Sequence, residues 1–173
     1  MPRENSAVEC PFRRCGETVK LKRFRQHAIN TQHSKMIPDL IAFKIPSDER
    51  DIEKHEWRMG AVSAFNLSFH LNLGYYKPSK CFVFSVWLGT SKDRAEKYRA
   101  CIRIGDKTDG DNELSFYGVR VTSIENIPSF YRCMEKNVKH FLCIPRILIK
   151  NLCENSEGSD GNKLIVQLKI SET

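Results

Sequence analysis

The sequence predicts a mainly β protein in which a small unit with two cysteines and two histidines precedes an antiparallel β-sandwich. Three observations support this prediction. Two Cys and two His lie close together near the start of the chain, apolar residues recur at alternate positions from about Trp57 onward, and few helical patterns interrupt these alternating segments. Short strands at this spacing are typical of a sandwich.

The chain divides into three parts. We expect the Cys/His unit to span residues 8–36, a connector to span 37–50 and the β-sandwich to span 51–173. Pro38 and Pro46 punctuate the connector, which is also rich in charge, as is typical of a boundary between units. A chain of 173 residues has room for one domain with a proper core and one small satellite unit.

The first unit has the ligand spacing of a zinc site. Four residues separate Cys10 from Cys15, eleven more precede His27, and five separate His27 from His33. A turn brings two thiolates together, and a helix over 21–31 brings two imidazoles to one side, as tetrahedral zinc requires. A unit of this size has almost no core of its own and needs such a staple. We therefore predict one structural Zn²⁺ bound by these four residues.

The positive charge of the chain is concentrated in the same region. Residues 1–35 contain eight Lys and Arg and three Glu, which accounts for +5 of the formal net charge of +7. Zinc fingers that read DNA usually leave about twelve residues between the second Cys and the first His, and they work in tandem. A single finger favours a protein partner for this surface. The alternative is loose phosphate contact through five basic residues, Arg13, Arg14, Lys22, Arg23 and Arg25.

The alternating segments predict the strands of the sandwich. Residues 65–73 alternate apolar and polar, as a half-buried strand does, whereas 81–88 are apolar on both faces, as a central strand is. Residues 98–104 alternate again, and a change of phase near Gly118 predicts a β-bulge. Further strands are predicted at 139–144 and 163–170, and the segments 124–137 and 146–152 remain open between irregular structure and short helices.

Several classes of protein do not fit this sequence. No apolar run approaches the roughly 18 residues of a membrane span, and charged residues near the amino terminus leave no room for a signal peptide. We expect a cytoplasmic protein, with the nucleus as the alternative, and free thiols packed in the core at the five remaining cysteines. No glycine-rich phosphate loop, nucleophile elbow or H-E-x-x-H motif is present, so no catalytic residue is predicted.

Longer segments resemble a known family. The stretches CPFRRCGETVKLKRFRQHAINTQH, VFSVWLGTSKDRAEKYRACIRIG and ELSFYGVRVTSI resemble the second zinc finger and the TRAF-like substrate-binding domain of the seven in absentia (Siah/SINA) ubiquitin ligases. Family motifs are matched by Leu88-Gly89-Thr90, Ala95-Glu96 and Ser123-Ile124. The resemblance covers about residues 9–171.

The resemblance implies that the sandwich holds short extended degron peptides of target proteins along a sheet edge. The family's Asp-Trp-x-Met segment at that groove is matched by Glu56-Trp57-Arg58-Met59. By this resemblance Glu56, Trp57 and Met59 contact the peptide, with Trp57 as an apolar wall and Met59 as an adaptable floor. Taken alone, Trp57 is as well explained as a core aromatic residue. The resemblance also implies a homodimer formed through the sandwich.

The match to the family is partial. The catalytic RING domain and the first of the two zinc fingers have no counterpart here, His27 and His33 are one residue further apart than in the family, and the connector is shorter. We therefore expect a recognition module whose ubiquitin transfer depends on a RING supplied by a partner. The alternatives are a TRAF-like adaptor or competitor without ligase activity and, less favoured, a nucleic-acid-binding finger.

Overall fold

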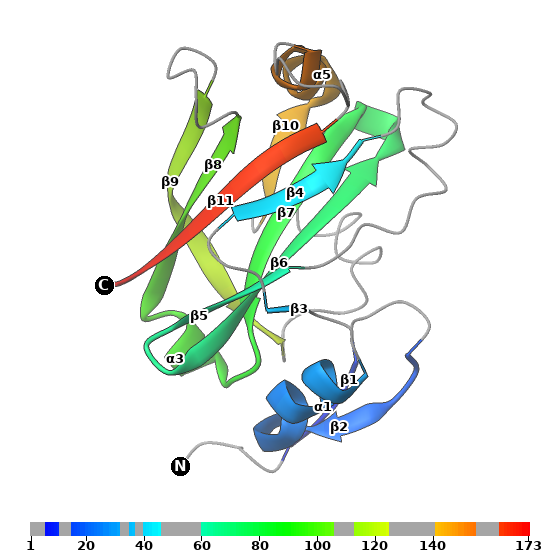
Figure 1. Cartoon of the computed structure of the whole chain (residues 1–173). Helices are drawn as coiled ribbons and strands as arrows, with labels where there is room; N and C mark the ends of the chain where they lie inside the picture. The colour runs from blue at the N-terminus through cyan, green and yellow to red at the C-terminus, as the bar shows by residue number, and fades with distance from the viewer. Residues whose placement is uncertain are drawn as a thin grey trace.

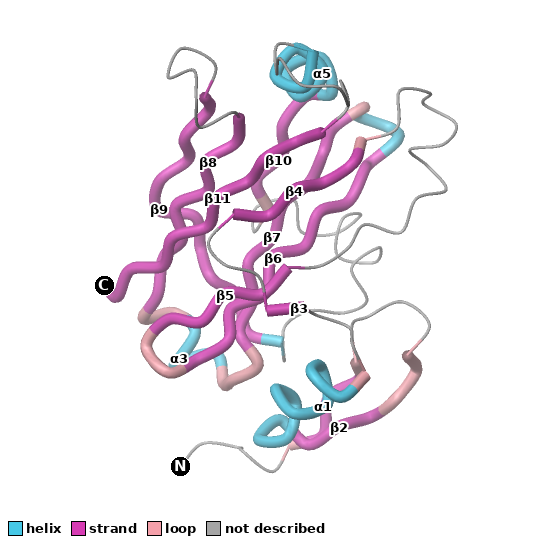
Figure 2. Tube along the Cα trace, viewed as in Figure 1, coloured by secondary structure: helices cyan, strands magenta, loops and turns pink. Residues whose placement is uncertain are grey.

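A computed structural model of the chain describes residues 6–10, 15–31, 35–36, 40–45, 60–105, 113–124, 141–154 and 163–173. Most of these residues lie in strands, and the helices are short (Figure 2). The prediction of a mainly β protein is confirmed. Among the described residues, no helix is both long enough and apolar enough to cross a lipid bilayer.

One sheet of nine strands forms the body of the protein, and it folds back on itself so that two layers face each other (Figure 1). Its strands are β3 (Lys35–Met36), β4 (Leu40–Lys44), β5 (Gly60–Ala64), β6 (Leu67–Tyr76), β7 (Cys81–Leu88), β8 (Tyr98–Gly105), β9 (Glu113–Ser123), β10 (Leu142–Pro145) and β11 (Lys163–Glu172). Their order is β3-β5-β6-β7-β9-β8-β11-β4, and β10 also pairs with β7. Strand β4 lies in the segment expected to be a connector, and it pairs with β11.

Strand β9 joins the two layers. It pairs antiparallel with β8 up to Arg120 and then parallel with β7 from Val121. The predicted bulge at Gly118 is confirmed, because Cys101 alone lies opposite Tyr117 and Gly118, and Gly118 has a φ of 68°. We predicted an antiparallel sheet, but two of its strand pairs are parallel. These pairs are β7 with β9 and β3 with β5. A bulge that bends β9 lets one strand serve both layers.

The core lies between the two layers. Strand β8 alternates as predicted, with Tyr98, Ala100, Ile102 and Ile104 buried. Strand β7 sends alternate residues into this core, and its other face is covered as well, which confirms that it is a central strand. Each large apolar side chain buried in this way contributes about 1.5–3 kcal/mol.

Strand β6 differs from its prediction. We expected a half-buried strand, but its polar face is buried too, with Ser68, His70 and Asn72 at most 7% exposed. Period-two alternation shows which residues share a face, but it does not show whether another part of the chain covers the polar face. At His70 the covering element is the N-terminal unit.

Helical segments close the ends of the sheet. They are η2 (Lys77–Ser79), α3 (Lys92–Ala95) and α5 (Arg146–Glu154). Helix α5 settles the open prediction for residues 146–152. Figure 1 shows α5 at one end of the sheet and α3 at the other.

The N-terminal unit is a two-stranded hairpin followed by a helix. It consists of β1 (Ala7–Glu9), β2 (Thr18–Lys20), η1 (Leu21–Arg23) and α1 (Phe24–Asn30). The helix predicted over 21–31 is thereby confirmed, with a 3₁₀ first turn. The unit lies at the α3 end of the body (Figure 1).

The unit and the body share a second, smaller core. Phe24 of α1 is fully buried and packs edge-on against Trp87 of β7, with ring centroids 5.4 Å apart, and against His70 of β6 at 6.2 Å. Trp87 and His70 stack on each other at 4.1 Å. Below, these three residues are called the aromatic joint. Val8, Leu21, Ala28 and Ile124 surround it.

We predict that Phe24→Ala lowers the free energy of unfolding by about 3–5 kcal/mol, because it removes a fully buried ring and leaves a cavity over Trp87. Urea unfolding measures this loss. Fluorescence of the same variant in a Trp57→Phe background, where Trp87 is the remaining tryptophan, should report a more exposed indole. Tyr117→Ala, at a residue 71% exposed, is the control and should cost less than about 1 kcal/mol. Equal losses of unfolding free energy in the two variants would contradict a stabilising role for the aromatic joint.

Candidate metal centre

Three of the four predicted zinc ligands come together in the N-terminal unit. One ligand atom from each of Cys10, Cys15 and His27 lies within 4.8 Å of the other two. Cys10 is buried, and the other two are partly buried. Two thiolates and an imidazole form a donor set typical of zinc, so this cluster could hold a metal ion. His33, the predicted fourth ligand, lies outside the described residues.

The separation between donors fits a tetrahedral ion. Sγ of Cys15 lies 3.4 Å from Nε2 of His27. Bonds of about 2.3 Å to sulfur and about 2.0 Å to nitrogen at the tetrahedral angle would separate these atoms by about 3.5 Å. Because all three ligand atoms lie within 4.8 Å of one another, each distance needs to shorten by at most about 1.3 Å to reach this geometry.

The hairpin fixes the two cysteines. Strands β1 and β2 pair from Ala7 with Lys20 to Glu9 with Thr18, and beyond them the backbone N–H of Cys10 donates to the carbonyl of Glu17 at 2.8 Å. Gly16 follows Cys15 with a φ of 64°, a conformation that favours glycine. The chain therefore returns sharply from Cys15 into β2. Helix α1 then carries His27 back over the hairpin.

Glu17 holds the other side of the histidine ring. Its carboxylate lies 3.3 Å from Nδ1 of His27, while Nε2 faces the thiol of Cys15. A carboxylate on one ring nitrogen fixes the neutral tautomer that leaves the other nitrogen free to bind a metal, and it raises the basicity of that nitrogen. No motif or spacing singled out Glu17, because its contact with His27 depends on how the hairpin packs against α1.

The other predicted site residues lie elsewhere. Glu56, Trp57 and Met59, predicted to contact a peptide, are outside the described residues. Of the cysteines expected in the core, Cys153 is buried, Cys81 and Cys101 are partly buried, and Cys133 is not described. The prediction was wrong for Cys143, which is exposed. Cys143 lies in β10, which pairs with β7 so that Cys143 is opposite Val83. A period-two pattern does not show which face of such a strand is left in solvent.

His70 and Trp87 were missed as residues that join the two units. His70 lies on the polar face of the strand predicted over residues 65–73, and a half-buried strand would leave that face in solvent. In the structure His70 is 2% exposed, and burial lowers its pKa from 6.5 to about 3. The ring is therefore neutral at physiological pH, which suits its stacking on Trp87.

Comparisons with known proteins add no family. No protein-family model matches the chain, and no curated protein matches it at a significant level.

We predict that Glu17→Gln weakens zinc binding about 10- to 100-fold, because the neutral amide supports the His27 ring less well than a carboxylate. Competition with a chromophoric chelator measures the affinity of the purified chain. Glu9→Gln, on the same hairpin, is the matched control and should bind zinc as the wild type does. Cys10→Ser gives the reference for loss of a ligand. Unchanged affinity in Glu17→Gln would show that the carboxylate does not support His27.

We predict that His70 makes the fold less stable in acid. Because its pKa is about 3 in the folded protein and 6.5 in the unfolded chain, the unfolded state binds the extra proton in this interval, and stability falls as the pH is lowered below 6.5. His70→Phe should remove up to about 1.4 kcal/mol per pH unit from this dependence. Urea unfolding of both proteins across the interval provides the comparison, since groups common to both cancel. If the free energy of unfolding has the same pH dependence in both proteins, His70 is not the group responsible.

Proposed function

We propose that this chain is the substrate-recognition module of a Siah/SINA-like ubiquitin ligase. In this proposal a structural Zn²⁺, bound by Cys10, Cys15, His27 and His33, stabilises the N-terminal unit. The TRAF-like body binds extended degron peptides of target proteins. The observation that carries the proposal is the position of the residues on which the family resemblance rests.

Some of those residues lie at the junction of the two units. A Cβ on Gly89 would lie 3.0 Å from the Phe24 ring, so this close approach favours glycine. Ser123 Oγ donates to the carbonyl of Thr90, and Ile124 packs in the same cluster as Phe24 and Trp87. Gly89 and Ile124 of the family motifs thus lie on the surface on which the N-terminal unit packs, whereas Leu88 and Ala95 fill the core between the layers. This shared packing supports the proposal that the N-terminal unit and the body form the finger and the TRAF-like domain of one recognition module.

The sheet offers an edge for a peptide. Strand β3 pairs with β5 over two residue pairs only, so most of β5 has a single described neighbour, β6. The Glu56-Trp57-Arg58-Met59 segment directly precedes β5 in the sequence. A guest strand added here would gain main-chain hydrogen bonds, and side chains from the segment would select the peptide. Ubiquitin transfer would then follow from proximity to a RING-bearing partner.

We predict that Trp57→Ala reduces peptide capture at least about tenfold, as expected for an aromatic anchor. Selection from a display library of random peptides gives ligands for the wild-type chain, and fluorescence anisotropy compares the variants. The thermal midpoint should stay within a few degrees of the wild type. A large drop in that midpoint with no specific loss of affinity would instead identify Trp57 as a core residue.

Capture from cells separates the ligase module from an adaptor. The wild-type chain should retain ubiquitinated proteins and a RING protein, and Trp57→Ala should lose the ubiquitinated proteins. Retention of peptide-bearing proteins with neither ubiquitin nor a RING protein would favour an adaptor or competitor.

A further inference from the structure

The outer face of one layer of the sheet carries several cationic side chains. Strands β9, β8 and β11 lie side by side in that order (Figure 1). Alternate residues of each strand fill the core, so the residues between them point away from it. We call this outward side the β8 face. Its main side chains are Arg99, Cys101 and Arg103 of β8, Tyr117 and Arg120 of β9, and Lys169 of β11.

The strand register brings these cations together. Arg99 lies directly opposite Arg120 on β9, and Cys101, the next outward residue of β8, lies opposite Lys169 on β11. Like charges directly opposite each other on neighbouring strands destabilise a sheet, so the fold keeps Arg99 beside Arg120 at a cost in stability. A bound anion would remove this repulsion.

Most of the positive charge on the β8 face is left without a carboxylate. Nη1 of Arg99 donates to the backbone carbonyls of Glu96 and Tyr98, at 2.9 and 2.8 Å, which fixes the side chain but does not neutralise it. Arg120 and Lys169 are exposed, and within the described ranges neither has an ion-pair partner. Three cations of the face are therefore available to an anionic ligand.

Arg103 is the one cation of the face that has a carboxylate nearby. Its Nε lies 3.7 Å from a carboxylate oxygen of Glu113, at the start of β9. This carboxylate also accepts a hydrogen bond from the hydroxyl of Ser115 at 2.6 Å. Glu113 is therefore occupied at its own end of the face and leaves Arg99, Arg120 and Lys169 uncompensated.

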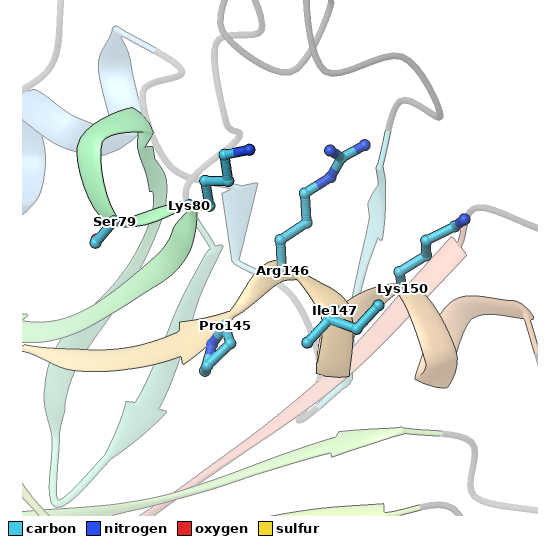
Figure 3. A pocket seen from close by; sticks show the side chains of 6 residues that line it. All are labelled: Ser79, Lys80, Pro145, Arg146, Ile147 and Lys150. Carbon is cyan, nitrogen blue, oxygen red and sulfur yellow. The ribbon is translucent and has the colours of Figure 1, made fainter.

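The pocket beside α5 differs in this respect (Figure 3). Arg146 and Lys150 are among its lining residues. Both already interact with other groups, so their charge is not left over for a ligand. The β8 face is therefore the better candidate for an anion-binding surface.

An exposed aromatic ring lies beside the cations of the β8 face. Tyr117 is 71% exposed at the bulge of β9. The Cys101 thiol, the Tyr117 hydroxyl and the Glu113 carboxylate raise the pKa of the Arg103 guanidinium, which shows that Tyr117 lies next to Arg103 on this face. A ring among cations can stack on a nucleobase while the cations pair with phosphates.

This combination suits single-stranded nucleic acid better than an acidic peptide. Of the large apolar residues exposed in the described part of the chain, Tyr117 is the one on the β8 face. The core of a protein interface is mostly apolar, and a single ring does not supply it. Bases of a single strand are free to stack on such a ring, whereas those of a duplex stack on one another.

From these observations we propose that the β8 face binds single-stranded nucleic acid. Phosphates of the strand pair with Arg99, Arg120 and Lys169, and one base stacks on the ring of Tyr117. Phosphate contacts and stacking carry little sequence information, so sequence preference should be weak. The inference goes beyond recognition of degron peptides and is independent of it, because it needs neither Trp57 nor a metal.

Fluorescence anisotropy on the full chain tests the phosphate contacts. The probes are labelled oligo(dT) and oligo(U) of about ten nucleotides, within the site sizes of single-strand binders, and binding of either supports the proposal. Arg120→Gln/Lys169→Gln should weaken binding at least about fivefold at physiological salt. It should also lower the slope of log K against log salt concentration by about 1.4, because two phosphate contacts are lost.

The matched control is Arg23→Gln/Arg25→Gln, which removes the same charge from exposed residues of the N-terminal unit. It should stay within about twofold of the wild type, because salt screens distant surface charges. This control also tests the other basic surface of the chain against the β8 face.

Substitutions of Tyr117 test the stacking contact. Tyr117→Ala should weaken binding about tenfold or more, as expected for the loss of one stacked base, whereas Tyr117→Phe keeps the ring and should bind as the wild type does. Because the side chain is exposed, both variants should fold, and thermal unfolding verifies this.

Four results would overturn the proposal. Equal or greater loss in Arg23→Gln/Arg25→Gln would show that net charge or the N-terminal unit attracts the strand. Unchanged affinity in Tyr117→Ala would show that no base stacks there. Tighter binding of a duplex, or of an acidic peptide of the same charge, would assign the face to another partner. The fourth is no binding of either oligonucleotide at about 100 µM protein, the weak end of non-specific affinities.

Discussion

The packing of Phe24 onto Trp87 and His70 is the interaction on which the arrangement of the whole molecule depends. The N-terminal unit is too small to bury its own apolar residues, and the outer face of the body would otherwise expose a tryptophan. The aromatic joint meets both needs at once, since each surface covers the other. It also explains why β7 is apolar on both faces: Phe82, Phe84, Val86 and Leu88 fill the core between the layers, while Trp87 faces the other way.

The aromatic joint depends on the Cys/His cluster, because Phe24 packs on the body only if α1 is held in place. Helix α1 has seven residues, and a helix this short is not stable in water without tertiary contacts. Donors on the hairpin and on α1 tie the two elements together, and Glu17 supports the ring of His27 from the other side. A bound metal would hold α1 in the position that presents Phe24 to the body. Its contribution would then extend beyond the N-terminal unit to the face of β6 and β7.

The two ends of the body have different chemistry. At the α3 end, aromatic and apolar groups are sealed between the N-terminal unit and the sheet, and His70 stays neutral because it is buried. At the α5 end, two neighbouring aliphatic residues of the helix, Ile147 and Leu148, are exposed. The first end is thus a permanent internal contact between the two units.

The sequence by itself determined the local features of this protein. Four features follow from periodicity or spacing within one stretch of the chain: the alternation of β8, the bulge at Gly118, the helix after the hairpin and the nearness of Cys10, Cys15 and His27. Only the tertiary structure decided that the polar face of β6 is buried, that Cys143 is exposed, that Glu17 reaches His27 and that β9 joins the layers. The reason is physical. Period and spacing fix which side chains share a face, but what covers that face depends on segments distant in the chain.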